Sequence, residues 1–318
     1  MLNWKVCTIL LLFSSALHGA WKDHLKKAKG KGEDHRMRNI DFIYMINLDA
    51  RPEKYALSKM LLEKYGINPY RFSAVNGWEL SMKAINDVGV KYQPGMTPLL
   101  ATTYVEVEGK KIPSHEFMRE GGKTYFNHCL PLGAIGCALS HISVLQDAYD
   151  SGYETIWVME DDIEPLEDPH QLSELIEELD ALVGADGWDV LFTDVDYRLG
   201  AGQYAPAYGA VKRPDMDCSF AERYSDQYTR VVQINEHFRK VAARFGTASM
   251  IIRRSGIIKL LAFSKNQNIY LPYDLENYLP KGMRRYGLTF DLVTNLLNAL
   301  SDIEKPDYLN TFQAMGGT

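Results

Sequence analysis

The stretch Thr155-Ile-Trp-Val-Met-Glu-Asp-Asp162 decides the fold, because an apolar run leads directly into three carboxylates. An apolar run without polar alternation is typical of a strand that is buried on both faces of a parallel sheet. In parallel α/β sheets, ligands bind at the edge formed by the carboxyl ends of the strands. The stretch therefore predicts an α/β fold in which Glu160, Asp161 and Asp162 lie at the ligand-binding edge.

Helices are predicted on both sides of this strand. Apolar residues recur at helical spacing over residues 131–150 and again over residues 168–183, and Asp168 is placed to cap the second helix. Trp188–Phe192 follows as another apolar strand. This alternation of helix and strand is typical of parallel sheets with helical connections.

The same alternation occurs upstream. The apolar runs 41–48 and 70–75 flank a helix that Pro52 opens, and Leu57 and Met60 belong to the predicted apolar side of that helix. Strand, helix and strand in close succession begin a unit with parallel strands. We therefore expect one central, mostly parallel sheet that is flanked by helices.

The remaining segments are less regular. Residues 78–130 are predicted to be an insertion with a hairpin turn at Gly109, and the Gly- and Tyr-rich residues 197–228 are predicted to be a long surface loop. Downstream, the sequence predicts a strand, a helix and a final helix, over residues 248–252, 255–263 and 290–300.

The first 20 residues have the order of a secretory signal, with Lys5, an apolar stretch and then small residues. Because the apolar stretch is shorter than the roughly 20 residues that span a membrane, we expect a signal that is cleaved after Ala16 or Ala20. The protein is then exported, to a secretory lumen or to a periplasm, and an uncleaved cytoplasmic form is the alternative. Residues 21–39 are predicted to be a solvated basic linker, and residues 40–318 a single domain.

Composition narrows the classes of function. The formal net charge of -6 provides no basic field for nucleic acid or anionic lipid, so we expect neither as a partner. Cys129, Cys137 and Cys218 follow the signal, and either one disulfide with one free thiol or three free thiols fit the sequence. No histidine stands at an offset that would complete a zinc site, so metal ligation by cysteine is not expected.

The three adjacent carboxylates form the candidate metal site. Neighbouring anions raise the cost of ionising one another unless a cation neutralises them, and hard oxygen ligands suit Mg²⁺ or Mn²⁺. Such an ion could join Glu160 and Asp162 to a diphosphate, while Asp161 holds the turn. The alternative is a solvated strand end whose aspartate caps a helix. Asp194 and Asp196 follow another strand, and whether they join the site is open.

Other polar residues stand where a ligand is expected. Asn47, Asp49 and Arg51 follow the first strand, where a nucleotide usually meets such sheets. His141 lies on the helix that precedes the central strand, and a single histidine there is as compatible with packing as with catalysis. Asp274 is either a general base that activates an alcohol or a helix cap.

Taken in chain order, these motifs resemble glycosyltransferase family 25, the family of lipopolysaccharide sugar transferases and procollagen galactosyltransferases. The matching segments are Tyr44–Asp49 with Arg51-Pro52-Glu53, Arg71–Gly77, Gly133–His141, Val158–Ile163, Gly246-Thr247 and Pro272–Asp274. The resemblance implies a Rossmann-like nucleotide-diphospho-sugar transferase fold of the GT-A type. It also implies a UDP-sugar donor, a divalent cation and transfer with inversion at the anomeric carbon.

The resemblance implies roles for the same residues. It places Glu160 and Asp162 on the metal and the diphosphate, Asp161 and the residues Asn47 to Arg51 on the donor, and His141 in the wall of the site. Asp274 becomes the candidate base.

On this resemblance, the chain moves a hexose, with galactose favoured, from a UDP-sugar to a glycan, a lipopolysaccharide or a hydroxylated protein. The acceptor stays open, because the insertion 78–130 and the loop 197–228 are where acceptor recognition should differ within the family. One alternative is a secreted, catalytically silent glycan-binding protein of the same fold, whose loop tyrosines stack on sugars. Another is a metal-dependent hydrolase that uses the same carboxylates.

Overall fold

The computed structural model describes residues 20–128, 130–196, 212–216 and 231–304. An eight-stranded sheet forms its centre. In spatial order, its strands are β10 (Val232–Gln233), β11 (Phe238–Lys240), β13 (Arg285–Leu288), β9 (Val190–Phe192), β12 (Ser249–Arg253), β7 (Thr155–Glu160), β1 (Phe42–Asn47) and β2 (Tyr70–Ser73). Only β11 and β12 run against the other strands of this sheet. The expected α/β fold with a mostly parallel central sheet is therefore confirmed.

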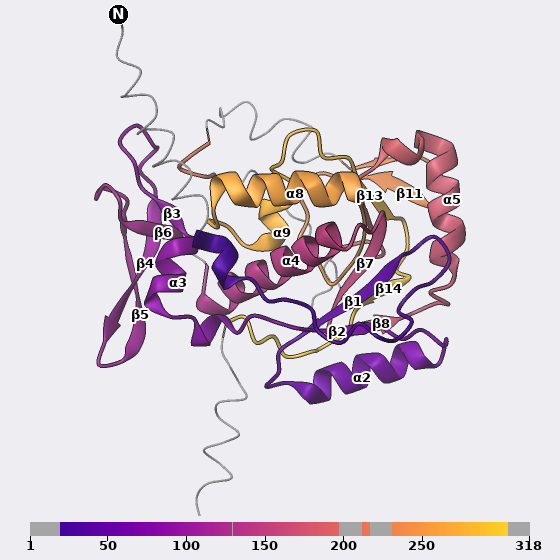
Figure 1. Ribbon diagram of the computed structural model, residues 1–318. Helices are drawn as coiled ribbons and strands as arrows, with labels where there is room; N and C mark the ends of the chain where they lie inside the picture. Colours follow the sequence, from indigo (N-terminus) through magenta and orange to yellow (C-terminus); the bar gives the residue numbers. More distant parts are fainter. Residues whose placement is uncertain (1–19, 129, 197–211, 217–230, 305–318) are drawn as a thin grey trace, which may run out of the picture.

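Helices cover both faces of this sheet (Figure 1). They are α4 (Leu132–Asp150) and α8 (Arg254–Gln267) on one face, and α2 (Pro52–Glu63) and α5 (Gln171–Val183) on the other. Successive side chains of β1 alternate between the two cores, since Tyr44 packs with residues of α4 and Met45 packs with residues of α2 and α5. Both side chains are fully buried, which explains the continuous apolar run of this strand.

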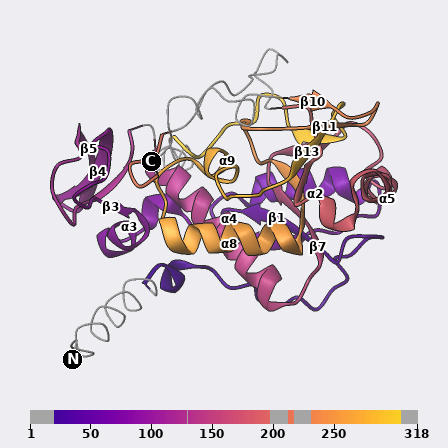
Figure 2. The same cartoon turned by 90° about the horizontal axis from the view of Figure 1, so that it is seen from above.

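Residues 78–130, the predicted insertion, form a smaller unit at the end of the molecule opposite α5 (Figures 1 and 2). Its elements are η2 (Gly77–Glu79), α3 (Met82–Val88) and an antiparallel sheet in the order β3 (Val90–Lys91), β6 (Thr124–Asn127), β4 (Leu100–Val107) and β5 (Lys110–Phe117). The predicted hairpin turn lies between β4 and β5, where Glu108 and Gly109 both have positive φ, as a two-residue turn requires. The domain boundaries themselves stay a prediction.

The prediction of a final helix over residues 290–300 is wrong. The remaining elements are η1 (Ala20–His24), β8 (Ile163–Pro165), η3 (Ala185–Gly187), α9 (Tyr273–Glu276) and β14 (Val293–Asn295). β14 pairs with β8, and residues 292–294 are consecutively buried, a pattern that suits a strand and not an amphipathic helix. Asp168 is not the N-cap of α5 either: that position is His170, whose backbone N–H donates to the Asp168 carboxylate at 2.9 Å.

The prediction of the apolar side of α2 is only partly confirmed, because Leu62 is buried and Tyr55 packs against the core, whereas Leu57 and Met60 do not. Leu57 and Met60 are 41% and 51% exposed, and within α2, which the structure describes completely, Leu62 is the only buried apolar residue. Ser58 is buried instead, because its hydroxyl donates to the backbone carbonyl of Asp161 at 2.7 Å. A hydrogen bond therefore attaches α2 to the end of β7 where the pattern predicted apolar packing.

Residues 21–39, expected to be a solvated linker, pack against the domain. The contacts that hold them include the buried Trp21, the ion pair between Lys31 and Asp147 at 2.8 Å, and two hydrogen bonds of 2.7 Å between the Lys29 backbone and the Tyr70 hydroxyl. Local positive charge in this segment thus has partners on the domain, which the sequence composition does not reveal.

Several predictions concern residues that the structure does not describe. These are the signal except for Ala20, Cys129, Cys218 and all of the loop 197–228 apart from residues 212–216. Cys137 is a free thiol. In the described part of the chain, no helix combines the length and the apolar character needed to cross a membrane.

Candidate active site

Two adjacent parallel strands bring the predicted polar residues to one edge of the sheet. β1 and β7 pair in parallel, so Asn47 at the end of β1 lies next to Glu160, Asp161 and Asp162, here called the acidic cluster. The Asn47 amide donates to Asp161 Oδ2 at 2.6 Å, and its oxygen accepts a hydrogen bond from Arg71 Nε at 2.8 Å. Arg71 therefore orients Asn47, which in turn orients the Asp161 carboxylate.

Glu160 is the most firmly held member of the acidic cluster. Its Oε1 accepts a hydrogen bond from the Thr247 hydroxyl at 2.8 Å and lies 3.2 Å from His141 Nε2. Burial alone would raise the pKa of Glu160, but His141 and Thr247 outweigh burial and lower it. His141 is itself held by a stacked Tyr273 ring, with 4.3 Å between ring centroids. The site thus keeps Glu160 ionised and fixed in place.

For Asp161 and Asp162, the other two members of the acidic cluster, ionisation of the carboxyl group is electrostatically unfavourable. Burial raises the pKa of Asp161 to about 6, against the lowering effect of its hydrogen bond from Asn47. Burial, together with repulsion from Glu160 and Asp161, raises the pKa of Asp162 to about 7. Among the described residues, Asp162 Oδ1 is buried and accepts no hydrogen bond. A buried oxygen without a donor, beside two further carboxylates, fits a site for a hard divalent cation.

Cys137 adds a thiol to the same place. With His141 and Glu160 it forms a possible metal-binding triad, whose ligand atoms lie within 4.8 Å of one another. No histidine was expected at an offset that would complete a zinc site, but the four-residue spacing does put Cys137 and His141 on one face of α4. Burial and the negative charge of Glu160 raise the pKa of the thiol well above its ordinary value. Mg²⁺ and Mn²⁺ prefer hard oxygen ligands to a thiol, so the carboxylate oxygens remain the better donors for such an ion.

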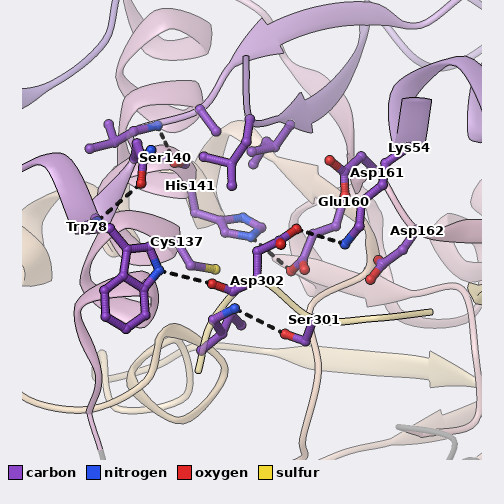
Figure 3. Close-up of a pocket in the computed structure, with 18 residues that line it drawn as sticks. Lys54, Trp78, Cys137, Ser140, His141, Glu160, Asp161, Asp162, Ser301 and Asp302 are labelled. Atoms are coloured by element: carbon purple, nitrogen blue, oxygen red, sulfur yellow. Dashed lines mark hydrogen bonds and ion pairs between the residues drawn. The ribbon is translucent and has the colours of Figure 1, made fainter. Parts of the chain in front are cut away.

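A pocket opens beside the acidic cluster (Figure 3). Its wall consists of the cluster, the face of α4 that carries His141, the loop 74–78 and residues 301–303. The loop approaches α4 closely because Gly77 and Gly136 lack side chains: a Cβ on Gly136 would lie 2.4 Å from the Gly77 nitrogen. The cavity volume is about 100 Å³, below the roughly 300–1,000 Å³ of most small-molecule sites.

Four predicted site residues do not line this pocket: Asn47, Asp49, Arg51 and Asp274. Asn47 and Arg51 contact residues that do line it, Asp161 and Asp302. The Asp49 side chain is 63% exposed, and its carboxylate accepts a hydrogen bond from Ser73 at 2.6 Å and lies 3.5 Å from Arg71. Asp274 lies on α9, where it accepts a hydrogen bond from the Gly246 N–H at 3.0 Å. Burial raises the pKa of Asp274. The donor-binding role of Asp49 and the catalytic role of Asp274 stay predictions.

Arg244 forms ion pairs with both aspartates of the second acidic pair, Asp194 and Asp196. Asp194 is buried and pairs with Arg244 Nη1 at 2.8 Å, and Asp196 lies 3.9 Å from Arg244 Nε. Neither aspartate lines the pocket beside the acidic cluster. The structure therefore gives Asp194 and Asp196 a charge partner of their own.

The sequence reasoning missed several residues of the site. Lys54 lines the pocket and stands one turn after Arg51, a spacing that could have indicated a second cation at the start of α2. Thr247 belongs to a segment that matches the family, but its role was not predicted; it lies just before β12, which runs antiparallel to β7 and therefore begins where β7 ends. Trp78 and Asp302 also line the pocket, and nothing in their local sequence indicates it.

The family model and the similar proteins all indicate the same family. The model of the family described as glycosyltransferase family 25 (LPS biosynthesis protein) matches residues 40–276. A glycosyltransferase 25 family member from Aedes aegypti is 29% identical over 55% of this chain, and one from Drosophila melanogaster is 28% identical over 44%. A Mus musculus relative named inactive glycosyltransferase 25 family member 3 is 24% identical over 48% of this chain.

These matches cover 24%, 19% and 22% of the respective relatives, so the chain spans about a quarter of their length or less. The family model, in contrast, spans most of this chain and includes β1, the acidic cluster and α9. The mixed α/β architecture with its large, mostly parallel sheet is consistent with the fold of nucleotide-sugar transferases. The chain belongs to glycosyltransferase family 25.

Proposed function

We propose that this chain is a metal-dependent glycosyltransferase that moves a hexose, with galactose favoured, from a UDP-sugar to a hydroxyl group, with inversion. The acceptor class is a glycan, a lipopolysaccharide or a hydroxylated protein. The observation that carries the proposal is the buried Asp162 Oδ1, which has no hydrogen-bond donor among the described residues, in a side chain that lines the pocket at the ligand-binding edge. Membership of a transferase family supports the reaction class.

Glu160 and Asp162 are the proposed ligands of Mn²⁺ or Mg²⁺. When bound, the ion would neutralise charge on the departing diphosphate. His141 and Thr247 hold Glu160 in one orientation, so that little reorganisation is needed when charge develops. Asn47 holds Asp161 in one orientation through its hydrogen bond.

Asp274 is the proposed general base. Its raised pKa brings this carboxyl group closer to the neutral range, where a base accepts a proton from an alcohol most effectively. Asp274 does not line the pocket, and one of its carboxylate oxygens accepts a hydrogen bond from the Gly246 N–H, so the acceptor hydroxyl would have to reach the carboxylate beside this bond.

The test is hydrolysis of UDP-sugars in a donor panel with Mn²⁺ and without acceptor. Asp162→Asn should lower turnover about 100-fold or more, because the amide supplies no negative charge for a cation. Circular dichroism should show an unchanged fold. Asp168→Asn, which replaces an exposed aspartate after β8, is the matched control and should keep full turnover. A folded wild-type protein that turns over no donor in the panel would contradict the proposal.

A catalytically silent glycan-binding protein is the second candidate. The Mus musculus relative is named as an inactive family member, which favours a silent protein as the alternative. Glycan-array binding without UDP binding in calorimetry would favour this candidate. For either function we propose an exported location, which rests on the signal-like order of the first 20 residues. Sequencing the mature N-terminus tests it.

A further inference from the structure

A segment near the end of the described chain crosses the candidate active site (Figure 3). Residues 301–303 line the same pocket as the acidic cluster. Trp78 Nε1 donates a hydrogen bond to the backbone oxygen of Asp302 at 3.1 Å. Next to it, a Cβ on Gly133 would lie 2.3 Å from the Ile303 oxygen, so the segment rests directly on the backbone of the first turn of α4. The segment is thus packed into the pocket.

The charge of Asp302 is matched by two cations at the start of α2. Asp302 Oδ1 pairs with the Arg51 guanidinium, and Asp302 Oδ2 lies 3.1 Å from Lys54 Nζ. The three side chains are only 12%, 13% and 10% exposed, in the order Arg51, Lys54 and Asp302. Arg51 also pairs with the exposed Glu53, whereas Lys54 also donates to the backbone oxygen of Leu300. A single carboxylate therefore bridges two nearly buried cations.

Asp302 adds a negative charge beside a cluster that is already acidic, and it contributes to raising the pKa of Asp161. Repulsion by that cluster opposes this position, so Arg51 and Lys54 are what hold the carboxylate there. Lys54 lines the pocket next to the acidic cluster, and Arg51 lies just behind the pocket lining at Asp302. Two cations beside carboxylates that fit a metal suit a ligand with two linked anionic groups. A diphosphate has this arrangement.

We infer that Arg51 and Lys54 form the diphosphate-binding site of the donor, and that Asp302 occupies this site as an internal competitor. The inference rests on the proposed function for the identity of the donor. Residues 300–303 then have to leave the pocket before a nucleotide sugar enters. The cavity of about 100 Å³ is too small for a nucleotide sugar while the segment is in place.

The competition has a measurable consequence. When only a fraction of molecules has the pocket open, the apparent Kd equals the intrinsic Kd divided by that fraction. Asp302→Asn keeps the shape of the side chain but removes its charge, so the segment is held less firmly. We expect the Kd for UDP to fall about tenfold. Glu304→Gln removes an exposed carboxylate two residues farther along and is the matched control, with an unchanged Kd.

The experiment is titration calorimetry on the full chain with UDP and, separately, with inorganic pyrophosphate, each with Mn²⁺. Asp302→Ala is a second variant, and urea unfolding verifies that each variant folds. Tighter binding of both probes by the Asp302 variants and not by Glu304→Gln supports the inference. Lys54→Met in the Asp302→Asn background should then weaken binding of both probes at least tenfold.

Three other outcomes separate the inference from the proposed function. An unchanged or increased Kd in both Asp302 variants overturns the inference, while turnover of a UDP-sugar by the wild type would leave the proposed function standing. Tighter pyrophosphate binding without turnover of any donor supports the anion site and contradicts the transferase. Absence of binding by both probes in every folded variant overturns the inference.

Discussion

Asp189 offers a quantitative test of the electrostatics of this fold, away from the pocket. Its side chain is fully buried, and its carboxylate accepts hydrogen bonds from Ser255 at 2.6 Å, from Lys259 at 2.7 Å and from the Arg284 side chain and backbone. Burial alone would raise its pKa, but these donors outweigh burial and lower it from 3.8 to about 2. Replacement by Asn keeps the shape and removes the charge.

The contribution of Asp189 to the free energy of unfolding follows from its pKa shift. A pKa lowered from 3.8 to about 2 corresponds to about 2 kcal/mol of unfolding free energy, at about 1.4 kcal/mol per pKa unit. Because the pKa is lower in the folded state, this contribution is present above about pH 4 and is lost as the pH falls towards about 2. Asp189→Asn should therefore be about 2 kcal/mol less stable than wild type at pH 7, and the gap should narrow below about pH 4 and close near about pH 2.

The assay is urea unfolding, followed by tryptophan fluorescence, at a series of pH values from 7 to below 3. Other carboxylates also titrate in this range, so the quantity of interest is the gap between variant and wild type at each pH. Asp186→Asn, an exposed aspartate in the turn before β9, is the matched control and should show no gap. A gap for Asp189→Asn that stays constant down to the lowest pH would refute the reasoning.

Two further predictions concern packing. Leu62→Ala should lower the free energy of unfolding by about 2–5 kcal/mol, because Leu62 is buried. Met60→Ala, on the exposed side of α2, should change it by less than about 0.5 kcal/mol. Equal effects of the two substitutions in urea unfolding would contradict the described orientation of the helix. Gly136→Ala should lower the free energy of unfolding by about 1–3 kcal/mol despite the better helix propensity of alanine. The reason is that the new Cβ would lie 2.4 Å from the Gly77 nitrogen and 2.6 Å from the Val75 oxygen. A higher melting temperature of the variant would count against this close approach.

The centre of the site could be predicted from the sequence for a simple reason. An apolar run that ends in carboxylates marks both a buried strand and the edge where it ends, and the parallel neighbour then has to end at the same edge. Asp161 and Asn47 meet in this way, since β1 and β7 pair directly. The i, i+4 relation of Cys137 and His141 is equally local, but its significance depends on the distant Glu160.

The rest could not be predicted, because it depends on partners far away in the chain. Residues 292–297 contain apolar residues at spacings that a helix would also explain, and pairing with β8 decides in favour of a strand. Leu57 and Met60 fit an amphipathic helix, yet Ser58 turns towards the sheet because Asp161 offers a carbonyl. Asp302 carries no local signal at all, since its position is defined by Arg51 and Lys54.

The packing of residues 21–39 bears on how the protein should be dissected. The match to the family begins at residue 40, and a fragment designed from that boundary would discard this segment. The cut would remove the buried Trp21, leave the Tyr70 hydroxyl without the Lys29 backbone and take Lys31 away from Asp147. The boundary of homology is therefore not the boundary of the cooperative unit. Affinity tags and protease sites belong before Ala20, because Lys29 and Lys31 take part in the packing of the segment against the domain.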